Sequence, residues 1–235
     1  ARTTIAQCVA GALAKLALKQ LAPQMDIYAF CSQIGTIYAN NPADIKAARA
    51  ISDGNAVRCP DSEAANKMES LIKEVHKEQD SIGGVVSCII ENCPVGLGEP
   101  LFDKLHARLG YTMLNINAAK GFEYGDGFDS ATQRGSYHND SFTTNEKGNI
   151  ATTSNHSGGI QGGISNGQTI SFRVAFKPTP TIGIAQQTVD KNLNAVTLEA
   201  KGRHDPCVVP RAVPVVENCA AFVILDSLLM NKIWQ

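Results

Sequence analysis

Residues 155–181 read NHSGGIQGGISNGQTISFRVAFKPTPT and contain the clearest strand pattern of the sequence. An apolar residue stands at every second position of its centre: Ile170, Phe172, Val174 and Phe176. Because successive side chains of a strand point to opposite faces, this alternation predicts a half-buried strand. A glycine-rich run precedes the strand and a Lys-Pro-Thr-Pro-Thr run follows it, so both flanks are suited to loops.

Helical and strand patterns alternate outward from this segment. Apolar spacing predicts helices over residues 3–21, 41–53, 62–77, 99–113 and 217–230. Apolar or β-branched runs predict two more strands, over residues 25–34 and 85–90. The sequence therefore indicates a protein that mixes helices and strands.

Four details of these helices are specific enough to test. We expect Asn41 and Asp61 to cap two of them. In the first helix, the larger apolar residues are expected to pack in the core: Ile5, Val9, Leu13 and Leu16. In the fourth, the expected apolar face is Leu101, Phe102, Leu105 and Leu109. The last helix is apolar almost all round, which predicts an interior position.

Residues 125–167 form a long stretch rich in Gly, Ser, Asn and Thr with little apolar periodicity. Ordinary connections are roughly 4–6 residues long, and much longer ones are usually functional or disordered. We expect a single domain over residues 1–235, with 125–167 as a long functional loop.

Charge and cysteine usage exclude several classes of protein. The 235 residues carry 21 basic and 22 acidic side chains, a net charge of −1, which disfavours binding to nucleic acid. Apolar runs fall short of the roughly 18 residues of a membrane span. The seven cysteines lack metal-ligand spacing. They indicate reduced thiols, no metal, and a cytoplasmic or organelle-matrix location.

Three segments carry residues suited to chemistry. The glycine-rich residues 155–168, with Lys177 and the threonines of 177–181, suit either an anion such as phosphate or a flexible hairpin connection. The pattern fits neither a P-loop nor a dinucleotide fingerprint. Arg203 beside Asp205 suits either a structural salt bridge or a site that binds an anion and moves a proton. Residues 120–128, KGFEYGDGF, suit either approach to a flat ring or a hairpin turn.

Taken together, these segments resemble the chorismate synthase family over nearly the whole chain. The similarity is carried by ARTTIA at the start, RCPD at 58–61, DSIGGVVSCIIENCPVGLGEPLFDKL at 80–105, NINAAKGFEYGDGF at 115–128, SYHND at 136–140, SNHSGGIQGGISNGQTISFRVAFKPTPTI at 154–182 and GRHDPCVVPRAVPVVE at 202–217. The resemblance implies an α+β fold in which helices are sandwiched between antiparallel sheets. It also implies a homotetramer.

The activity implied is that of a carbon–oxygen lyase acting on phosphates. Such an enzyme converts 5-enolpyruvylshikimate 3-phosphate into chorismate and phosphate by a 1,4-elimination of the shikimate pathway, which leads to the aromatic amino acids. Reduced FMN is the implied cofactor. The source of its electrons, NADPH used directly or an external flavin reductase, stays open.

Site residues follow from the matching motifs. The resemblance implies FMN contacts at Asn117, Ala118, Gly162, Lys177, Pro178, Thr179, Pro180, Thr181 and Arg203. It assigns substrate binding to Arg2 and Arg203, and proton transfer to Asp205.

The family's N-terminal motifs, with several substrate arginines and two proton-donating histidines, are not found in these residues. We therefore expect the chain by itself to be inactive. One alternative is a truncated, non-catalytic flavin-binding or assembly subunit of the same family. Another is a phosphate-ligand binding domain in which the Arg203–Asp205 pair is only structural.

Overall fold

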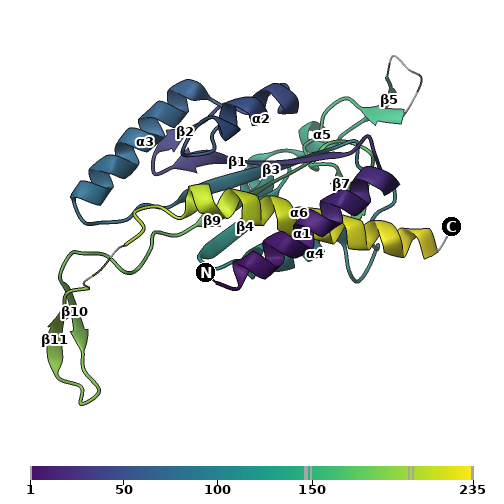
Figure 1. Cartoon of the computed structure of the whole chain (residues 1–235). Coiled ribbons are helices and arrows are strands. Elements are labelled where there is room, and N and C mark those ends of the chain that lie inside the picture. The colour runs from purple at the N-terminus through teal and green to yellow at the C-terminus, as the bar shows by residue number, and fades with distance from the viewer. Residues whose placement is uncertain (1, 146–147, 149, 201, 203, 234–235) are drawn as a thin grey trace. The chain divides into compact units, whose positions relative to one another are not determined.

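The computed structural model describes residues 2–145, 148, 150–200, 202 and 204–233 (Figure 1). The chain forms two compact units. The first unit consists of Ala1–Ala29, Ser87–Val174 and Val213–Gln235, and the second of Phe30–Val86 and Ala175–Ala212.

Five strands form the main sheet, in the order β2-β1-β3-β9-β4. Its strands are β1 (Asp26–Ile34), β2 (Ile37–Tyr38), β3 (Gly84–Glu91), β4 (Ala119–Tyr124) and β9 (Ile170–Phe176). Gly125 donates its N–H to the Ser171 carbonyl at 3.0 Å, and Glu123 pairs with Arg173 at 2.6 Å, so β4 and β9 run antiparallel. With the helices below, the chain is an α+β protein, as predicted.

The first unit also contains α1 (Thr4–Leu21), α4 (Leu105–Leu114) and most of α6 (Val209–Ile233). Residues 125–167 fold into short elements: the 3-10 helix η1 (Gly127–Thr132), α5 (Gly135–His138) and the hairpins β5 (Phe142–Thr144) with β6 (Ile150–Thr152) and β7 (Ile160–Gln161) with β8 (Ile164–Ser165).

The second unit contains α2 (Ile45–Asp53), α3 (Ser62–Lys77) and a hairpin of β10 (Gln186–Val189) and β11 (Ala195–Leu198). Asp61 caps α3 by accepting the Ala64 N–H at 3.0 Å, as the sequence predicts. The cap predicted at Asn41 is wrong, because α2 begins at Ile45 and the Asp44 carboxylate accepts the Lys46 and Ala47 N–H groups.

Helices α1 and α6 approach each other closely at Gly11 (Figure 1). A Cβ atom at Gly11 would lie 2.3 Å from the Cβ of Asn218. Lys15 of α1 pairs with Glu217 of α6, and Glu217 also accepts the N–H of Ala29 at 2.9 Å. The close approach at Gly11 brings Lys15 and Glu217 together. Glu217 therefore links both helices to β1, the strand that contains Ala29.

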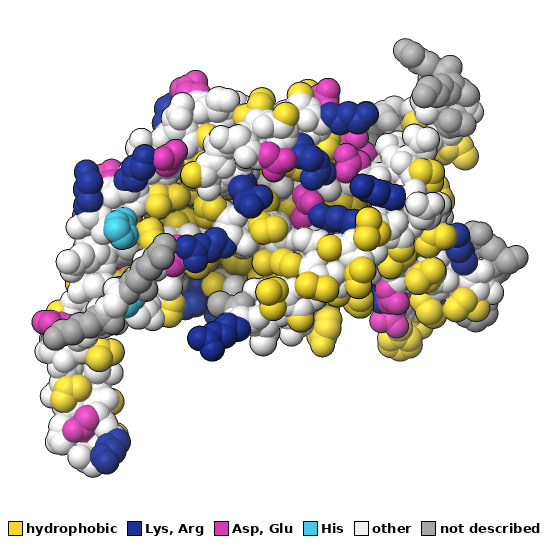
Figure 2. Space-filling view, viewed as in Figure 1, with side chains coloured by type: hydrophobic (Ala, Val, Ile, Leu, Met, Phe, Trp, Pro, Cys, Tyr) yellow, Lys and Arg dark blue, Asp and Glu magenta, His cyan; other side chains and the backbone are white. Residues whose placement is uncertain are grey.

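This close approach explains why the core residues predicted for α1 are wrong. The helix buries its small side, Gly11 and Ala14, together with Leu18. The expected core residues, Ile5, Val9, Leu13 and Leu16, are all exposed. Apolar side chains are visible on the molecular face over α1 and α6 in Figure 2.

Two further helix boundaries differ from the prediction. Helix α4 begins at Leu105, not near residue 99, because Asp103 has a left-handed φ of +56° and Lys104 has a non-helical ψ of 136°. Leu101 and Phe102 are consequently exposed, whereas Leu105 and Leu109 are buried as expected. Helix α6 begins at Val209, so Pro210 and Pro214 lie within its bounds.

Helix α6 is long and apolar enough to span a membrane by length and composition. However, 61% of its most apolar window is buried within the fold, which is typical of a core helix. Strand β9 likewise behaves as its alternation predicts, since Ile170, Phe172, Val174 and Phe176 are buried.

The contact at Gly11 gives a test of α1 packing. In a Gly11→Ala variant, we expect the free energy of unfolding to fall by about 1–3 kcal/mol, because the new methyl group meets the backbone of α6. Helix propensity alone predicts the opposite sign, a gain of about 1 kcal/mol. Urea denaturation distinguishes the two, with the exposed neighbour Ala12→Ser as the control. A more stable Gly11→Ala protein would contradict the packing.

Candidate functional site

The residues predicted to form the site divide between the two units. Asn117, Ala118, Gly162 and Arg2 belong to the first unit, and Lys177–Thr181 and Asp205 to the second. Arg203 lies outside the described residues.

In the second unit, the segment 177–181 holds the backbone around Asp205. The Thr179 hydroxyl donates to the Asp205 carbonyl at 2.9 Å, and the Ser81 hydroxyl donates to the Thr179 carbonyl at 2.6 Å. The N–H of Ile82 donates to the Pro206 carbonyl at 2.8 Å. Two motifs that are distant in the sequence thus meet, and the hydroxyl expected to bind phosphate is already donated to a carbonyl.

The Asp205 carboxylate has an arginine partner that the sequence analysis did not identify. Arg211 Nη1 lies 3.1 Å from Asp205 Oδ2. Because the Arg211 side chain is 70% exposed, this pair contributes little to stability, at most about 1 kcal/mol. The pair instead favours one orientation of the Asp205 carboxylate.

A cavity of about 510 Å³ lies beside Asp205 within the second unit. Its wall carries one acid and four basic side chains: Lys73, His76, His204 and Arg211. The Asp205 side chain is 25% exposed. This cavity therefore combines a carboxylate able to take up a proton with groups suited to an anionic ligand.

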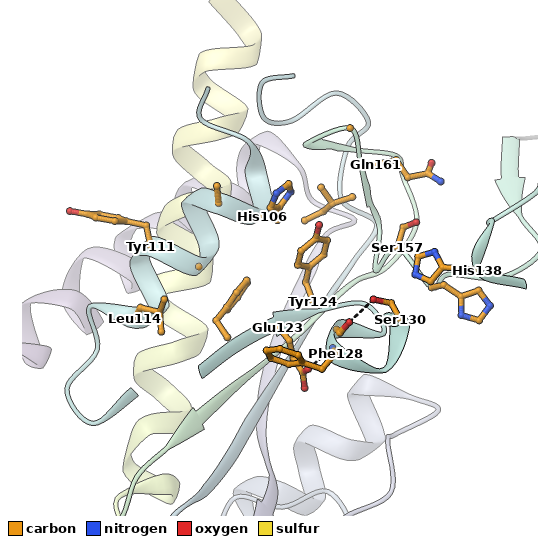
Figure 3. A pocket seen from close by; sticks show the side chains of 17 residues that line it. His106, Tyr111, Leu114, Glu123, Tyr124, Phe128, Ser130, His138, Ser157 and Gln161 are labelled. Carbon is orange, nitrogen blue, oxygen red and sulfur yellow. Dashed lines mark hydrogen bonds between the residues drawn. The ribbon is translucent and has the colours of Figure 1, made fainter. Parts of the chain in front are cut away.

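In the first unit, a cavity of about 730 Å³ lies between α4, β4, η1 and the loop that leads to β7 (Figure 3). We call it the aromatic pocket; its lining includes His106, Phe122, Tyr124, Phe128, His156 and Gly162. The pocket is of the size that binds small molecules. Segment 120–128, for which a flat-ring site and a hairpin turn were both open, contributes to its wall.

His106 and Tyr124 stack within the pocket, with ring centroids 4.7 Å apart and planes 12° from parallel (Figure 3). Burial and the nearby Lys104 charge lower the pKa of His106. The imidazole is therefore neutral at pH 7. Its buried Nδ1 has no hydrogen-bond partner among the described residues.

His156 is held by Asp126. Its Nδ1 lies 2.6 Å from Asp126 Oδ2, and the Asp126 N–H donates to the His156 carbonyl at 2.9 Å. Gln133 also donates to Oδ2 at 2.8 Å. Partial burial acts to raise the pKa of Asp126, but the hydrogen bonds from Gln133 and His156 outweigh it and keep this pKa below its usual range.

A buried carboxylate shapes the loop that carries His156. Asp140 accepts the N–H groups of His156 and Ser157, at 2.8 and 2.9 Å, and the Ser154 hydroxyl at 2.8 Å. Burial acts to raise the pKa of Asp140, but these bonds lower it to about 2. The carboxylate stays ionised and fixes the loop backbone.

The remaining predicted residues of the first unit differ in setting. Gly162 lines the aromatic pocket with a left-handed φ of +61°, and a Cβ there would meet no atom within 4 Å. Ala118 has φ of +70°, a strained conformation for a residue other than glycine. Asn117 and Arg2 are exposed. Only Gly162 of these four lines the pocket.

These observations define an α+β protein with a ligand-sized aromatic pocket and a separate carboxylate in a basic cavity. The chorismate synthase family model matches residues 1–229, and the chain belongs to that family.

Known relatives agree. The chain is 55% identical to the chorismate synthase of Cytophaga hutchinsonii and 56% identical to that of Parabacteroides distasonis, each match covering 99% of this chain and 64% of the relative. A crystal structure of chorismate synthase matches with a TM-score of 0.79 and 30% identity, over 97% of this chain and 63% of that one. The chain therefore spans less than two thirds of the length of these relatives.

The hydroxyl of Thr179 provides a first test of the site. In a Thr179→Val variant, we expect the free energy of unfolding to fall by about 1 kcal/mol, because the hydrogen-bond donor to the Asp205 carbonyl is lost. For the same reason, amide exchange at residues 204–208 should be faster. Hydrogen exchange measured by mass spectrometry checks this, and the exposed Thr181→Val serves as the matched control. Equal exchange in the two variants would show that Thr179 does not hold the turn.

Asp140 provides a pH-dependent test. Its native pKa of about 2 lies below the ordinary value of 3.8, so it stabilises the fold above about pH 4 and loses this effect as the pH falls toward 2. Between pH 5 and pH 2, the wild type should lose about 2 kcal/mol more than Asp140→Asn. Urea denaturation at both pH values measures this difference, with the exposed Asp129→Asn expected to follow the wild type. An equal loss in Asp140→Asn would refute the role of Asp140.

Proposed function

We propose that this chain forms part of a chorismate synthase, converting 5-enolpyruvylshikimate 3-phosphate into chorismate and phosphate with reduced FMN. The observation that carries the proposal is the setting of Asp205: its backbone is held by Thr179, its carboxylate is paired with Arg211, and it faces a basic cavity. Membership of the family supports the reaction assigned to this position.

The overall reaction breaks the bond to a phosphate leaving group and removes a ring proton. Asp205 assists the transfer of this proton, and two arginines named by the family motifs, Arg203 and Arg2, bind the anionic substrate. A carboxylate that is paired with Arg211 before the substrate arrives needs little reorganisation during the reaction.

The chain's residues are suited to holding FMN. The open space at Gly162 admits a ring, and the aromatic pocket supplies surfaces on which it can stack. Lys177, with the hydroxyl of Thr181, suits the ribityl phosphate, and the proposed contacts are completed by Asn117, Ala118, Pro178, Thr179, Pro180 and Arg203. When bound, reduced FMN supplies electron density to an elimination that is redox-neutral overall.

We further propose a homotetrameric assembly in the cytoplasm or an organelle matrix, in which NADPH or an external reductase keeps the flavin reduced. The exposed apolar residues of α1 suit coverage by another part of such an assembly. The chain alone is expected to be inactive, because the proton-donating histidines and substrate arginines of the family lie outside its motifs. The second candidate function is a non-catalytic flavin-binding or assembly subunit.

A chimera separates these two functions. The part of the Cytophaga hutchinsonii relative that the match leaves out is fused to this chain, and chorismate and phosphate are assayed anaerobically with reduced FMN. We expect turnover by the chimera, and a fall in kcat of about 100-fold or more in its Asp205→Asn variant. The exposed Asp53→Asn is the control for loss of a carboxylate in the same unit.

Three results would overturn the proposal. An inactive, folded chimera favours the non-catalytic subunit. Full activity of the Asp205→Asn chimera would show that Asp205 does not transfer the proton. Turnover by the isolated chain contradicts the expectation that it lacks essential groups.

A further inference from the structure

Asp205 and Arg211 lie on either side of a short turn, and the backbone of each is held in place. The Thr179 hydroxyl donates to the Asp205 carbonyl at 2.9 Å. Arg211 lies in the first turn of α6, where its N–H donates to the Val208 carbonyl at 3.1 Å. The fully buried Val209 anchors the start of this helix. The contact of 3.1 Å between Arg211 Nη1 and Asp205 Oδ2 therefore joins two side chains that project from fixed positions.

Other bases of the same cavity have partners elsewhere. Lys73 pairs with Glu69 at 2.6 Å, and His204 Nε2 lies 3.1 Å from a backbone carbonyl oxygen. Among the described residues, Arg211 is the one base that pairs with the Asp205 carboxylate. Removal of the Arg211 side chain would therefore leave this carboxylate without its charged partner.

The ion pair engages one oxygen of the Asp205 carboxylate and leaves the other open. Arg211 lies on Oδ2, whereas Oδ1 has no hydrogen-bond partner within the part of the chain that the structure describes. The terminal torsion of an aspartate is broad, so the carboxylate turns easily when nothing holds it. A positive charge fixed on one side favours one setting of the carboxylate plane.

We propose that Arg211 is a positioning residue for the proposed reaction: it holds one oxygen of Asp205, so that the other oxygen receives the ring proton. In that step the ring C–H bond breaks, the proton goes to the carboxylate, and the electron pair stays in the ring as a new double bond. The C–O bond to phosphate breaks, and its electron pair leaves with the phosphate. This inference rests on the proposed function and adds a role for Arg211 that the family resemblance does not assign.

Steady-state kinetics of the chimera test this role. Arg211→Gln should lower kcat by about 10-fold to 100-fold, because the carboxylate is no longer held in its reactive setting. The KM should change less than about 3-fold, since substrate binding does not depend on that setting. Arg211→Lys keeps the charge without the planar group and should give an intermediate kcat. Lys46→Gln, which removes an exposed positive charge from α2 of the same unit, is the control and should match the wild type.

A double variant shows whether Arg211 acts through Asp205. In the Asp205→Asn chimera, adding Arg211→Gln should change kcat less than about 2-fold, because no charged carboxylate remains to be held. Guanidinium ion should restore part of the kcat of Arg211→Ala, whereas urea, which has a similar shape but no charge, should not. Circular dichroism checks that each variant is folded.

The ion pair can also be measured in the chain itself, without the chimera. In ¹⁵N-labelled protein at pH 7, the side-chain N–H signals of Arg211 should shift in Asp205→Asn and stay in place in Asp53→Asn. Unchanged signals in Asp205→Asn would show that the two side chains do not pair in solution, and would overturn the proposal.

Three results in an active chimera would also overturn it. The first is an unchanged kcat in folded Arg211→Gln. The second is a raised KM at unchanged kcat, which would make Arg211 a substrate-binding residue. The third is an equal fold loss of kcat from Arg211→Gln with and without the Asp205 carboxylate. The proposed function fails in a different way, through a wild-type chimera that binds substrate and reduced FMN without forming chorismate, and that result removes the reaction that Arg211 would serve.

Discussion

The buried carboxylate of Asp140 is the constraint on which the aromatic pocket depends. A buried charge must be satisfied by hydrogen bonds, and here the partners are two backbone N–H groups and a hydroxyl from residues 154–157. Those bonds fix the backbone that carries His156 and precedes Gly162. The glycine-rich run is thereby a defined wall of a cavity and not a loose connection.

In the second unit too, a side-chain hydrogen bond holds the backbone of a proposed site residue. Segment 177–181 was expected to present hydroxyls to a phosphate, but the Thr179 hydroxyl is donated to the Asp205 carbonyl. The segment therefore holds the proposed proton-transfer residue, while Lys177 and the Thr181 hydroxyl stay suited to an anion. Arg211 completes this arrangement as a partner of the carboxylate.

What could be predicted from the sequence follows from local physical chemistry. The alternation in β9 and the cap at Asp61 depend on neighbouring residues, and both are confirmed. The prediction of which face of α1 is buried was wrong, because apolar spacing does not reveal that α6 approaches at Gly11. The Asp126–His156 pair was missed since its members are 30 positions apart and neither belongs to a recognised catalytic pattern.

We propose that FMN contacts both the glycine-rich run and segment 177–181. Hydrogen exchange of the chain with and without FMN, followed by mass spectrometry, tests it most directly. FMN is expected to slow exchange in residues 156–163 and also in residues 177–183, while the β10–β11 hairpin stays unchanged. Protection in only one of the two segments, or in neither, would contradict it.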